Sequence, residues 1–351
     1  MIDTDSIFLA TSRLAEDGAL RAAAVAQLKA VCGSPAYRDW QSSPSQLRPF
    51  KLPASFTVDA LNTLGLVQDG ALGVRVNLIG QSTVLTDGVW VDARIRVFPF
   101  ADESEAILAY CRRRGLVHWA DTVIDLATGS GHNLAFFGNG VRRIGMDINP
   151  RALAYFHCNH VLNEQTDRVG MLNDIRDGFA GVVGGAAGSR TLVLGNLPFG
   201  LASTRDMLAL TSNGGDNGLQ LQGAAFRAIA AFRQTPQGAH AHAVLLGYSL
   251  GNAATKQWEL VDLAKSIVGA DSVVFDVPAH EGLLRVDGRR TMANPSPLRP
   301  ALDMAGGCRL YHPDPVAART RYAALSDRFI AQGFNDLAYV IVEIAPAGAR
   351  A

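Results

Sequence analysis

Two closely spaced glycines and a later aspartate are the residues of this chain whose types and spacing best suit ligand binding. Gly129 and Gly131 follow a short apolar run at residues 122–126, which is typical of a strand buried on both faces of a parallel sheet. We expect a helix directly afterwards, from Asn133 to Phe137. Glycine tolerates positive φ and lets a ligand approach the backbone, and the first turn of a helix has unpaired N–H groups. The stretch therefore predicts a nucleotide-binding turn.

The spacing of the following residues argues against a dinucleotide. A dinucleotide fingerprint has a third glycine three residues after the second, where this chain has Leu134. A second strand is expected at Arg142 to Met146, and Asp147 closes it. This acid follows Gly131 by 16 residues, fewer than the usual interval of about 20 in dinucleotide folds. A carboxylate at the end of a strand can accept hydrogen bonds from a ribose diol.

Residues 121–150 resemble the class I S-adenosylmethionine-dependent methyltransferases, whose first motif is D-x-x-x-G-x-G and whose second ends in an acid. Asp125, Gly129, Gly131 and Asp147 match these motifs, although any strand, glycine turn and helix of an α/β protein shares the glycines alone. The resemblance implies S-adenosylmethionine as the cofactor, with its methionine part at Asp125 and the glycines and its ribose at Asp147. A third strand is expected at residues 169–172. The full cofactor-binding set that the resemblance implies, with the adenine at Asp174 and Ile175, is Asp125, Ala127, Thr128, Gly129, Gly131, Asn133, Asp147, Ile148, Asn149, Asp174, Ile175 and Asn196.

A second motif, Asn196-Leu197-Pro198-Phe199, follows an apolar strand expected at residues 191–194. It resembles the [N/D/S]-P-P-[Y/F] motif of enzymes that methylate glutamine amides, adenine and the exocyclic amine of guanine, and the N-L-P-[Y/F] form also occurs in rRNA adenine dimethyltransferases. Because the lone pair of such a nitrogen is delocalised, acceptors that favour a pyramidal nitrogen make it a nucleophile, and the resemblance assigns this role to Asn196 Oδ1 and the Leu197 carbonyl. Pro198 stiffens the turn, and Phe199 offers a face for a planar group.

The order of elements is closest to the HemK-type protein-glutamine methyltransferases that modify release factors. Ser104 and Glu105, at the start of a helix expected over residues 103–114, match part of the P-R-P-x-T-E segment of that family. Leu197 stands where that family has the first proline, so the acceptor stays open. The candidates are a protein or peptide, a small molecule of specialised metabolism and, third, an RNA base. A non-enzymatic module that only binds the cofactor is a further alternative.

The pattern as a whole predicts an α/β fold, the Rossmann-like seven-stranded sheet of class I methyltransferases, over residues 99–351. Residues 1–98 should form a separate substrate-recognition module of helices and a β-hairpin or meander. In that module, helical spacing runs from Ser6 to Val31, and its alanine-rich part should be one helix closed by Gly33. A helix at about 58–66 and strands at 73–80, 82–85 and 89–98 should follow. An inserted, lid-like segment is expected at about 279–335, and it contains the cations Arg285, Arg289 and Arg290.

Composition and charge indicate the cellular compartment of the protein and the classes of partner that it binds. The chain has 351 residues, 48% of them apolar, and a formal net charge of zero, so no global positive field attracts nucleic acid. Its four cysteines lie far apart, which favours a reducing compartment, the cytoplasm, over a disulfide framework or a zinc site. His157 and His160 share a helix face, but no further ligand completes a metal motif, so we expect no metal. We expect neither a secretory signal nor a membrane span.

Overall fold

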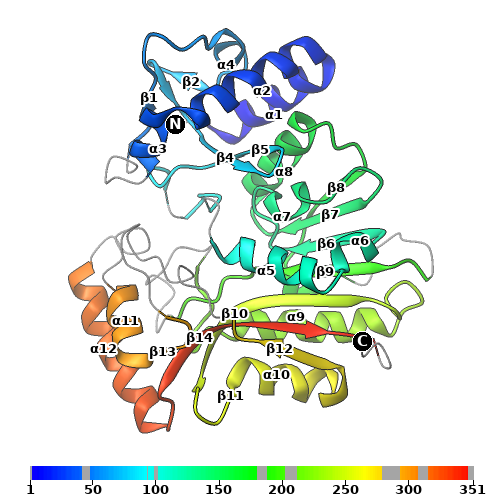
Figure 1. Ribbon diagram of the computed structural model, residues 1–351, viewed down its shortest axis with the longest axis vertical. Coiled ribbons are helices and arrows are strands. Elements are labelled where there is room, and N and C mark those ends of the chain that lie inside the picture. The colour runs from blue at the N-terminus through cyan, green and yellow to red at the C-terminus, as the bar shows by residue number, and fades with distance from the viewer. Residues whose placement is uncertain are drawn as a thin grey trace. The chain divides into compact units, whose positions relative to one another are not determined.

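The computed structural model describes residues 2–41, 48–92, 94–98, 102–179, 188–201, 212–278, 293–306 and 315–346 (Figure 1). The chain divides into two compact units. The first unit contains Met1–Phe100 and Ala127–Leu172, and the second contains Ala101–Leu126 and Asn173–Ala351. The predicted division into domains 1–98 and 99–351 stays a prediction.

The first unit begins with helices α1 (Thr4–Glu16), α2 (Gly18–Gly33) and α3 (Pro35–Gln41), and α4 (Asp59–Thr63) follows. The alanine-rich helix closed by Gly33 is confirmed as α2. Asp17 separates it from α1, because Asp17 leaves the helical conformation and its side chain accepts a hydrogen bond from Leu20 N–H. Residues of α1, α2 and α8 (Pro150–Leu162) share one hydrophobic core, which includes Leu14, Leu28 and Tyr155.

The predicted β-meander is only partly right. Strands β4 (Arg75–Ile79) and β5 (Ser82–Thr86) form the expected antiparallel hairpin. The third expected strand, Val89 to Phe98, is wrong for its described residues, which form turns. The N–H groups there bond locally, for example from Arg96 to Asp92, or to the Asp87 carboxylate, so they are not available to a neighbouring strand. A small antiparallel sheet that was not expected is made by β1 (Phe50–Lys51), β2 (Val67–Gln68) and β3 (Ala71–Leu72).

The second part of the first unit has the expected alternation of strands and helices. Strand β7 (Arg142–Asp147) pairs in parallel with β8 (Arg168–Leu172), and Asp147 is opposite Leu172. The helix expected after the glycines is α7 (His132–Ala135), which is shorter than predicted. The helix that carries His157 and His160 is α8, whose side chains are nearly all buried.

Among the described residues of the second unit, the five longer strands lie in the order β12-β14-β10-β9-β6. Strands β6 (Thr122–Leu126), β9 (Thr191–Gly195) and β10 (His242–Asn252) are parallel, and every residue of β6 and β9 is buried. Strand β14 (Asp336–Ile344) is antiparallel to β10 and to β12 (Val273–Asp276). With β7 and β8, all seven predicted strands form, and the protein is a mixed α/β fold with a mostly parallel sheet.

The helices of the second unit are α5 (Asp102–Arg113), α6 (Leu116–Trp119), α9 (Gln220–Arg233), α10 (Glu259–Val268), α11 (Leu298–Gly306) and α12 (Pro315–Ala331). Short elements are the 3-10 turns η2 (Ile175–Asp177) and η3 (Ala270–Ser272) and strands β11 (Gln257–Trp258) and β13 (Ser296–Pro297). Helices α11 and α12 lie in the predicted insertion and share a core with Leu201 and Leu250. Arg285, Arg289 and Arg290 lie outside the described residues. No helix of the described ranges is long and apolar enough to span a membrane.

A buried carboxylate on β14 fixes the far end of α5. Glu343, which has no exposed side-chain surface, accepts hydrogen bonds from Tyr110 Oη at 2.7 Å and Arg114 Nε at 2.8 Å. His242 Nδ1 lies 3.2 Å from its other oxygen. Burial alone would raise the pKa of Glu343, but the hydrogen bonds from these three side chains outweigh it and lower the pKa to about 2. The group is therefore an ion in the folded protein at neutral pH.

Candidate functional site

The glycine turn of the first unit, residues 127–131, has an uncommon backbone conformation. Ala127, Gly129 and Gly131 all have positive φ, of 57°, 54° and 79°. The turn is closed by hydrogen bonds from Thr128 N–H to the Met146 carbonyl at 2.8 Å and from Gly131 N–H to the Thr128 carbonyl at 2.9 Å. Ala127 adopts a conformation that is costly for a residue with a side chain, and such conformations concentrate at functional sites.

Gly131 is required by packing as well as by its backbone conformation. A Cβ atom at this position would lie 2.7 Å from Phe156 Cδ2 and 2.9 Å from His160 Cε1, both on α8. Real Cβ atoms do not approach other carbon atoms so closely. The second glycine of the predicted motif therefore lets the turn lie directly on helix α8.

Asp147 and the first glycine of the turn are in direct contact. Asp147 Oδ2 accepts a hydrogen bond from Gly129 N–H at 2.8 Å, and Oδ1 accepts one from Asn149 N–H at 2.9 Å. Burial raises the pKa of Asp147, and these backbone hydrogen bonds oppose that rise. A carboxylate offers about four acceptor positions, and the Ile148 N–H also acts on Asp147, so the carboxylate keeps capacity for a further donor. The two sequence motifs are thus joined through a single side chain.

Most other predicted cofactor residues of the first unit lie in or beside this turn. Thr128 and Asn133 are buried, with 1% and 2% of their surface exposed. Asn149 caps helix α8 by accepting a hydrogen bond from Arg151 N–H. Ile148 follows Asp147 and is 50% exposed, although it is a large apolar side chain. An exposed isoleucine beside a half-buried acid is available to contact a ligand.

The predicted cofactor residues of the second unit have different surroundings. Asp125 lies within β6 and is fully buried. Asp174 caps η2, and its carboxylate accepts hydrogen bonds from the backbone and the guanidinium of Arg176. These hydrogen bonds with Arg176 lower the pKa of Asp174. Ile175 is the first residue of η2.

The Asn196-Leu197-Pro198-Phe199 motif directly follows β9, as expected. Asn196 Nδ2 donates a hydrogen bond to Ser104 Oγ at 3.1 Å, and Ser104 is a buried residue in the first turn of α5. This contact uses the nitrogen side of the amide and leaves Oδ1 on the opposite side. The Leu197 side chain is buried, whereas Pro198 and Phe199 are half-buried.

Phe199 packs against two tyrosines that the sequence did not single out. Its ring centroid lies 4.8 Å from that of Tyr248 and 5.6 Å from that of Tyr339, and both contacts are nearly perpendicular. Tyr248 on β10 and Tyr339 on β14 are direct cross-strand partners, with centroids 4.5 Å apart. The signal in the sequence is a single tyrosine within each of two largely apolar strands.

The hydroxyl groups of these tyrosines form a hydrogen-bonded chain with the Glu103 carboxylate. Tyr339 Oη lies 2.7 Å from Glu103 Oε1 and 3.0 Å from Tyr248 Oη. An ionised carboxylate can only accept, so Tyr339 donates to Glu103 and Tyr248 donates to Tyr339. Glu103 and Ser104 are neighbours on α5, so the start of this helix contacts both Asn196 and the aromatic cluster behind Phe199.

The described residues contain no group of three or more His, Cys, Asp or Glu side chains that would hold a metal ion. His160 is fully buried, and its Nδ1 lies 2.7 Å from the Phe156 carbonyl. Burial lowers its pKa to about 3, so the ring is neutral at physiological pH. Its ring also packs on Phe156, at 4.2 Å between centroids, beneath the glycine turn.

Comparison with known proteins finds similarity only at the level of solved structures. No protein-family model and no curated protein matches the chain. Phosphoethanolamine N-methyltransferase 2 of Haemonchus contortus, in complex with phosphomonomethylethanolamine and S-adenosylhomocysteine, is 11% identical with a TM-score of 0.39, over 73% of this chain and 56% of that one. The chain thus spans little more than half the length of the Haemonchus protein.

Two further structures show a similar degree of likeness. The YcgJ protein of Bacillus subtilis is 11% identical with a TM-score of 0.40, over 70% of this chain and 100% of that one. TYW2 of M. jannaschii, in complex with AdoMet, is 11% identical with a TM-score of 0.38, over 79% of this chain and 88% of that one. With TM-scores below 0.5, these similarities carry no argument about activity, which must rest on the site itself.

Proposed function

We propose that the protein is an S-adenosylmethionine-dependent methyltransferase that methylates an amide or amino nitrogen, with a glutamine-like group of a protein as the acceptor. The observation that carries this proposal is the hydrogen bond from Gly129 to Asp147. It joins the glycine motif and the acid of the second strand in one compact feature, in a turn whose conformation few residues adopt.

The donor would bind at the glycine turn. Asp147 would accept a hydrogen bond from the ribose diol, because its carboxylate keeps acceptor capacity after the backbone contacts. Gly131 and Gly129 would let the methionine part approach the main chain, with Asp125 as its partner, and Asp174 with Ile175 would contact the adenine. When bound, S-adenosylmethionine supplies an electrophilic methyl group.

The acceptor nitrogen would lie at the Asn196 motif. Because Asn196 Nδ2 is held by Ser104, its Oδ1 and the Leu197 carbonyl would accept the N–H groups of the acceptor. Phe199 would support a planar amide, and its own position is fixed by Tyr248 and Tyr339. Such preorganisation favours in-line attack, and holding reactants in a near-attack geometry contributes about 7 kcal/mol or more in favourable cases.

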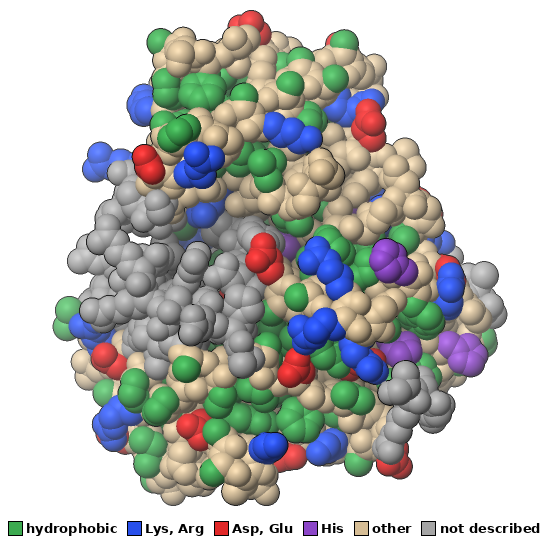
Figure 2. Space-filling view, in the orientation of Figure 1, with side chains coloured by type: hydrophobic (Ala, Val, Ile, Leu, Met, Phe, Trp, Pro, Cys, Tyr) green, Lys and Arg blue, Asp and Glu red, His purple; other side chains and the backbone are tan. Residues whose placement is uncertain are grey.

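Two other acceptor classes have some support. A small molecule is consistent with the net charge of zero, which also weighs against RNA. On the face shown in Figure 2, basic and acidic side chains are interspersed over the described surface, which suits neither a polyanion nor a strongly charged partner. An RNA base is favoured only by the leucine of the motif. The three cysteines within the described residues are free, which is consistent with a cytoplasmic enzyme.

The test is in two steps. Calorimetry with S-adenosylhomocysteine first asks whether the chain binds the donor family, and absence of binding would overturn the proposal. Incubation with methyl-labelled S-adenosylmethionine and separate protein, RNA and metabolite fractions then asks which fraction acquires the label. Label in the protein fraction supports the glutamine-like acceptor. Label only in the RNA or the metabolite fraction refutes a protein acceptor and identifies that fraction as the source of the acceptor.

A further inference from the structure

We propose that residues 87–92 and 94–98, here called the Asp87 segment, form a wall of the donor site, and that the buried ion pair Asp87–Arg151 holds this wall in place. The inference rests on the proposed function, because it assigns the nucleoside part of the donor to the surface beside Asp147. It adds a binding element from the amino-terminal part of the chain, which the motifs do not include.

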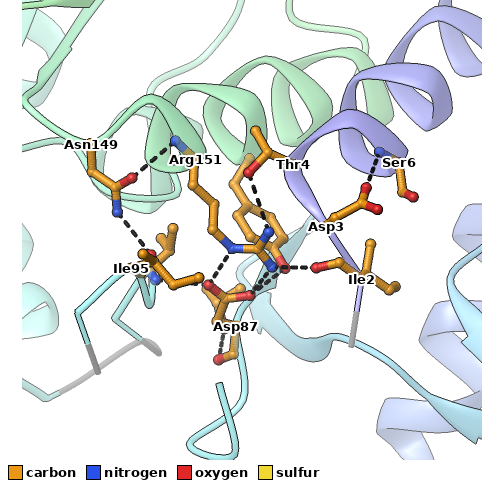
Figure 3. A network of polar contacts seen from close by, with 11 residues as sticks. Ile2, Asp3, Thr4, Ser6, Asp87, Ile95, Asn149 and Arg151 are labelled. Atoms are coloured by element: carbon orange, nitrogen blue, oxygen red, sulfur yellow. Dashed lines mark hydrogen bonds and ion pairs between the residues drawn. The ribbon is translucent and has the colours of Figure 1, made fainter. Parts of the chain in front are cut away.

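Asp87 anchors the segment at both of its ends. Its carboxylate, which is fully buried, accepts hydrogen bonds from Arg151 Nε at 2.8 Å and Arg151 Nη2 at 2.6 Å (Figure 3). It accepts two more, from Tyr155 Oη and from Val97 N–H, both at 2.8 Å. The bond to Val97 joins residues that are ten positions apart and so closes the loop onto its own first residue. The two-pronged contact with Arg151 fixes that loop on helix α8.

Arg151 also holds the first described residues of the chain. Its Nη2 donates to the Ile2 carbonyl at 2.8 Å, and its side chain is only 4% exposed (Figure 3). Its guanidinium carbon lies 5.4 Å from the Tyr155 ring centroid. A buried arginine needs such partners, because an unpaired buried charge is very costly. The ion pair therefore lies at the centre of a fully enclosed polar cluster.

A second tether connects the segment to Asp147. Asn149 Nδ2 donates to the Ile95 carbonyl at 3.0 Å (Figure 3), while Asn149 N–H donates to Asp147 Oδ1 at 2.9 Å. The same residue thus contacts the proposed ribose-binding acid through its backbone and the Asp87 segment through its side chain. Asn149 and Arg151 are the start of α8, so both tethers come from one rigid element.

The segment reaches the glycine turn itself. A Cβ atom on Gly129 would lie 4.0 Å from Val97 Cγ1, which is an ordinary van der Waals contact, and Val97 is buried. Ile95, two residues earlier, is 47% exposed, and Ile148 beside Asp147 is 50% exposed. Two large apolar side chains are therefore left in solvent near Asn149. A flat, weakly polar base attached to a ribose at Asp147 is the ligand that would cover them.

The first test removes an exposed side chain, so that folding is not at risk. Ile95→Ser should weaken S-adenosylhomocysteine binding about tenfold in calorimetry, because an apolar side chain would no longer be covered by the ligand. Leu78→Ser on β4 is the matched control, since Leu78 is 46% exposed in the same unit. The control should bind as the wild type does. Equal affinities of the wild type, Ile95→Ser and Leu78→Ser would overturn the inference.

The second test addresses the ion pair as a positioning element. The double substitution Asp87→Leu with Arg151→Met removes both charges together, so no unpaired buried charge remains. A folded double variant should bind S-adenosylhomocysteine at least tenfold more weakly. In the wild type, amide hydrogen exchange at Ile95 and Val97 should slow when S-adenosylhomocysteine binds, whereas exchange in the β4–β5 hairpin should not change. A purely structural role of the pair would give no such ligand-dependent protection.

The outcomes separate the two proposals. If the wild type does not bind S-adenosylhomocysteine, the proposed function fails. If the wild type binds and exchange at Ile95 and Val97 stays the same with and without ligand, the proposed function stands and the wall is refuted. Protection at these residues together with weaker binding of Ile95→Ser supports both.

Discussion

Replacing Gly131 by alanine should destabilise the protein by an amount that separates into two physical causes. The residue has φ of 79°, where a non-glycine residue costs about 1–2 kcal/mol. The new Cβ would also lie 2.7 Å from Phe156 Cδ2 and 2.9 Å from His160 Cε1, and overpacking of this kind costs about 1–3 kcal/mol. We therefore expect the free energy of unfolding to fall by about 2–5 kcal/mol.

Two other glycines of the same unit provide matched controls. Gly140 has φ of 92°, but no atom lies within 4 Å of the position that its Cβ would occupy, so Gly140→Ala should show only the backbone cost of about 1–2 kcal/mol. Gly138 has neither a positive φ nor a close neighbour, so Gly138→Ala should be close to neutral. The order of destabilisation should be Gly131, then Gly140, then Gly138.

The assay is equilibrium denaturation in urea for the wild type and the three variants, followed by calorimetry with S-adenosylhomocysteine on those that fold. The Gly131→Ala variant should also lose donor affinity, because its turn must move away from α8. If Gly131→Ala is no less stable than Gly140→Ala, then the Phe156 and His160 side chains move aside without lowering the free energy of unfolding, and the packing argument is wrong.

Three further predictions concern acidic and amide side chains. Asp147→Ala should weaken S-adenosylmethionine binding in calorimetry, and an unchanged dissociation constant would refute the ribose assignment. Asn196→Ala should reduce methyl transfer in the labelling assay while donor affinity stays close to that of the wild type, and equal turnover would remove the nitrogen-acceptor argument. The pKa of Glu343 is lowered from 4.5 to about 2 on folding, so its stabilising effect is present above about pH 4.5 and is lost as the pH falls towards 2. Glu343→Gln should accordingly cost on the order of 3 kcal/mol of unfolding free energy at pH 7 and little near pH 2, as measured by urea denaturation across pH.

The strands and the glycine turn were predictable because local sequence determines them. Strands β6 and β9 are short apolar runs that are buried at every residue, and a fully buried strand admits few polar residues. The turn was predictable for a similar reason, since only glycine suits positions such as Gly131. The two predicted motifs meet in the hydrogen bond from Gly129 N–H to the Asp147 carboxylate.

The rest of the site depends on contacts between residues distant in sequence. Tyr248 and Tyr339 become neighbours only through the antiparallel register of β10 and β14, which no local pattern specifies. The Asp87 segment resembled a strand because Val89 to Phe98 contains apolar residues at alternating positions. Its N–H groups instead donate hydrogen bonds to backbone carbonyls within the segment and to the Asp87 carboxylate. These local hydrogen bonds prevent the strand that the alternating pattern predicts.

Helix α5 shows how the same residues can have a local and a distant role. Ser104 near a helix start is ordinarily a capping residue, yet its hydroxyl accepts a hydrogen bond from Asn196, and Glu103 beside it accepts one from Tyr339. Further along the helix, about 9 Å from Ser104 for Tyr110 and about 15 Å for Arg114 at a rise of 1.5 Å per residue, these two side chains bind the buried Glu343. A rigid helix fixed at this end fixes the position of its start. The Glu343 cluster should therefore orient the acceptor motif as well as stabilise the fold, so Glu343→Gln should impair transfer more than it impairs donor binding.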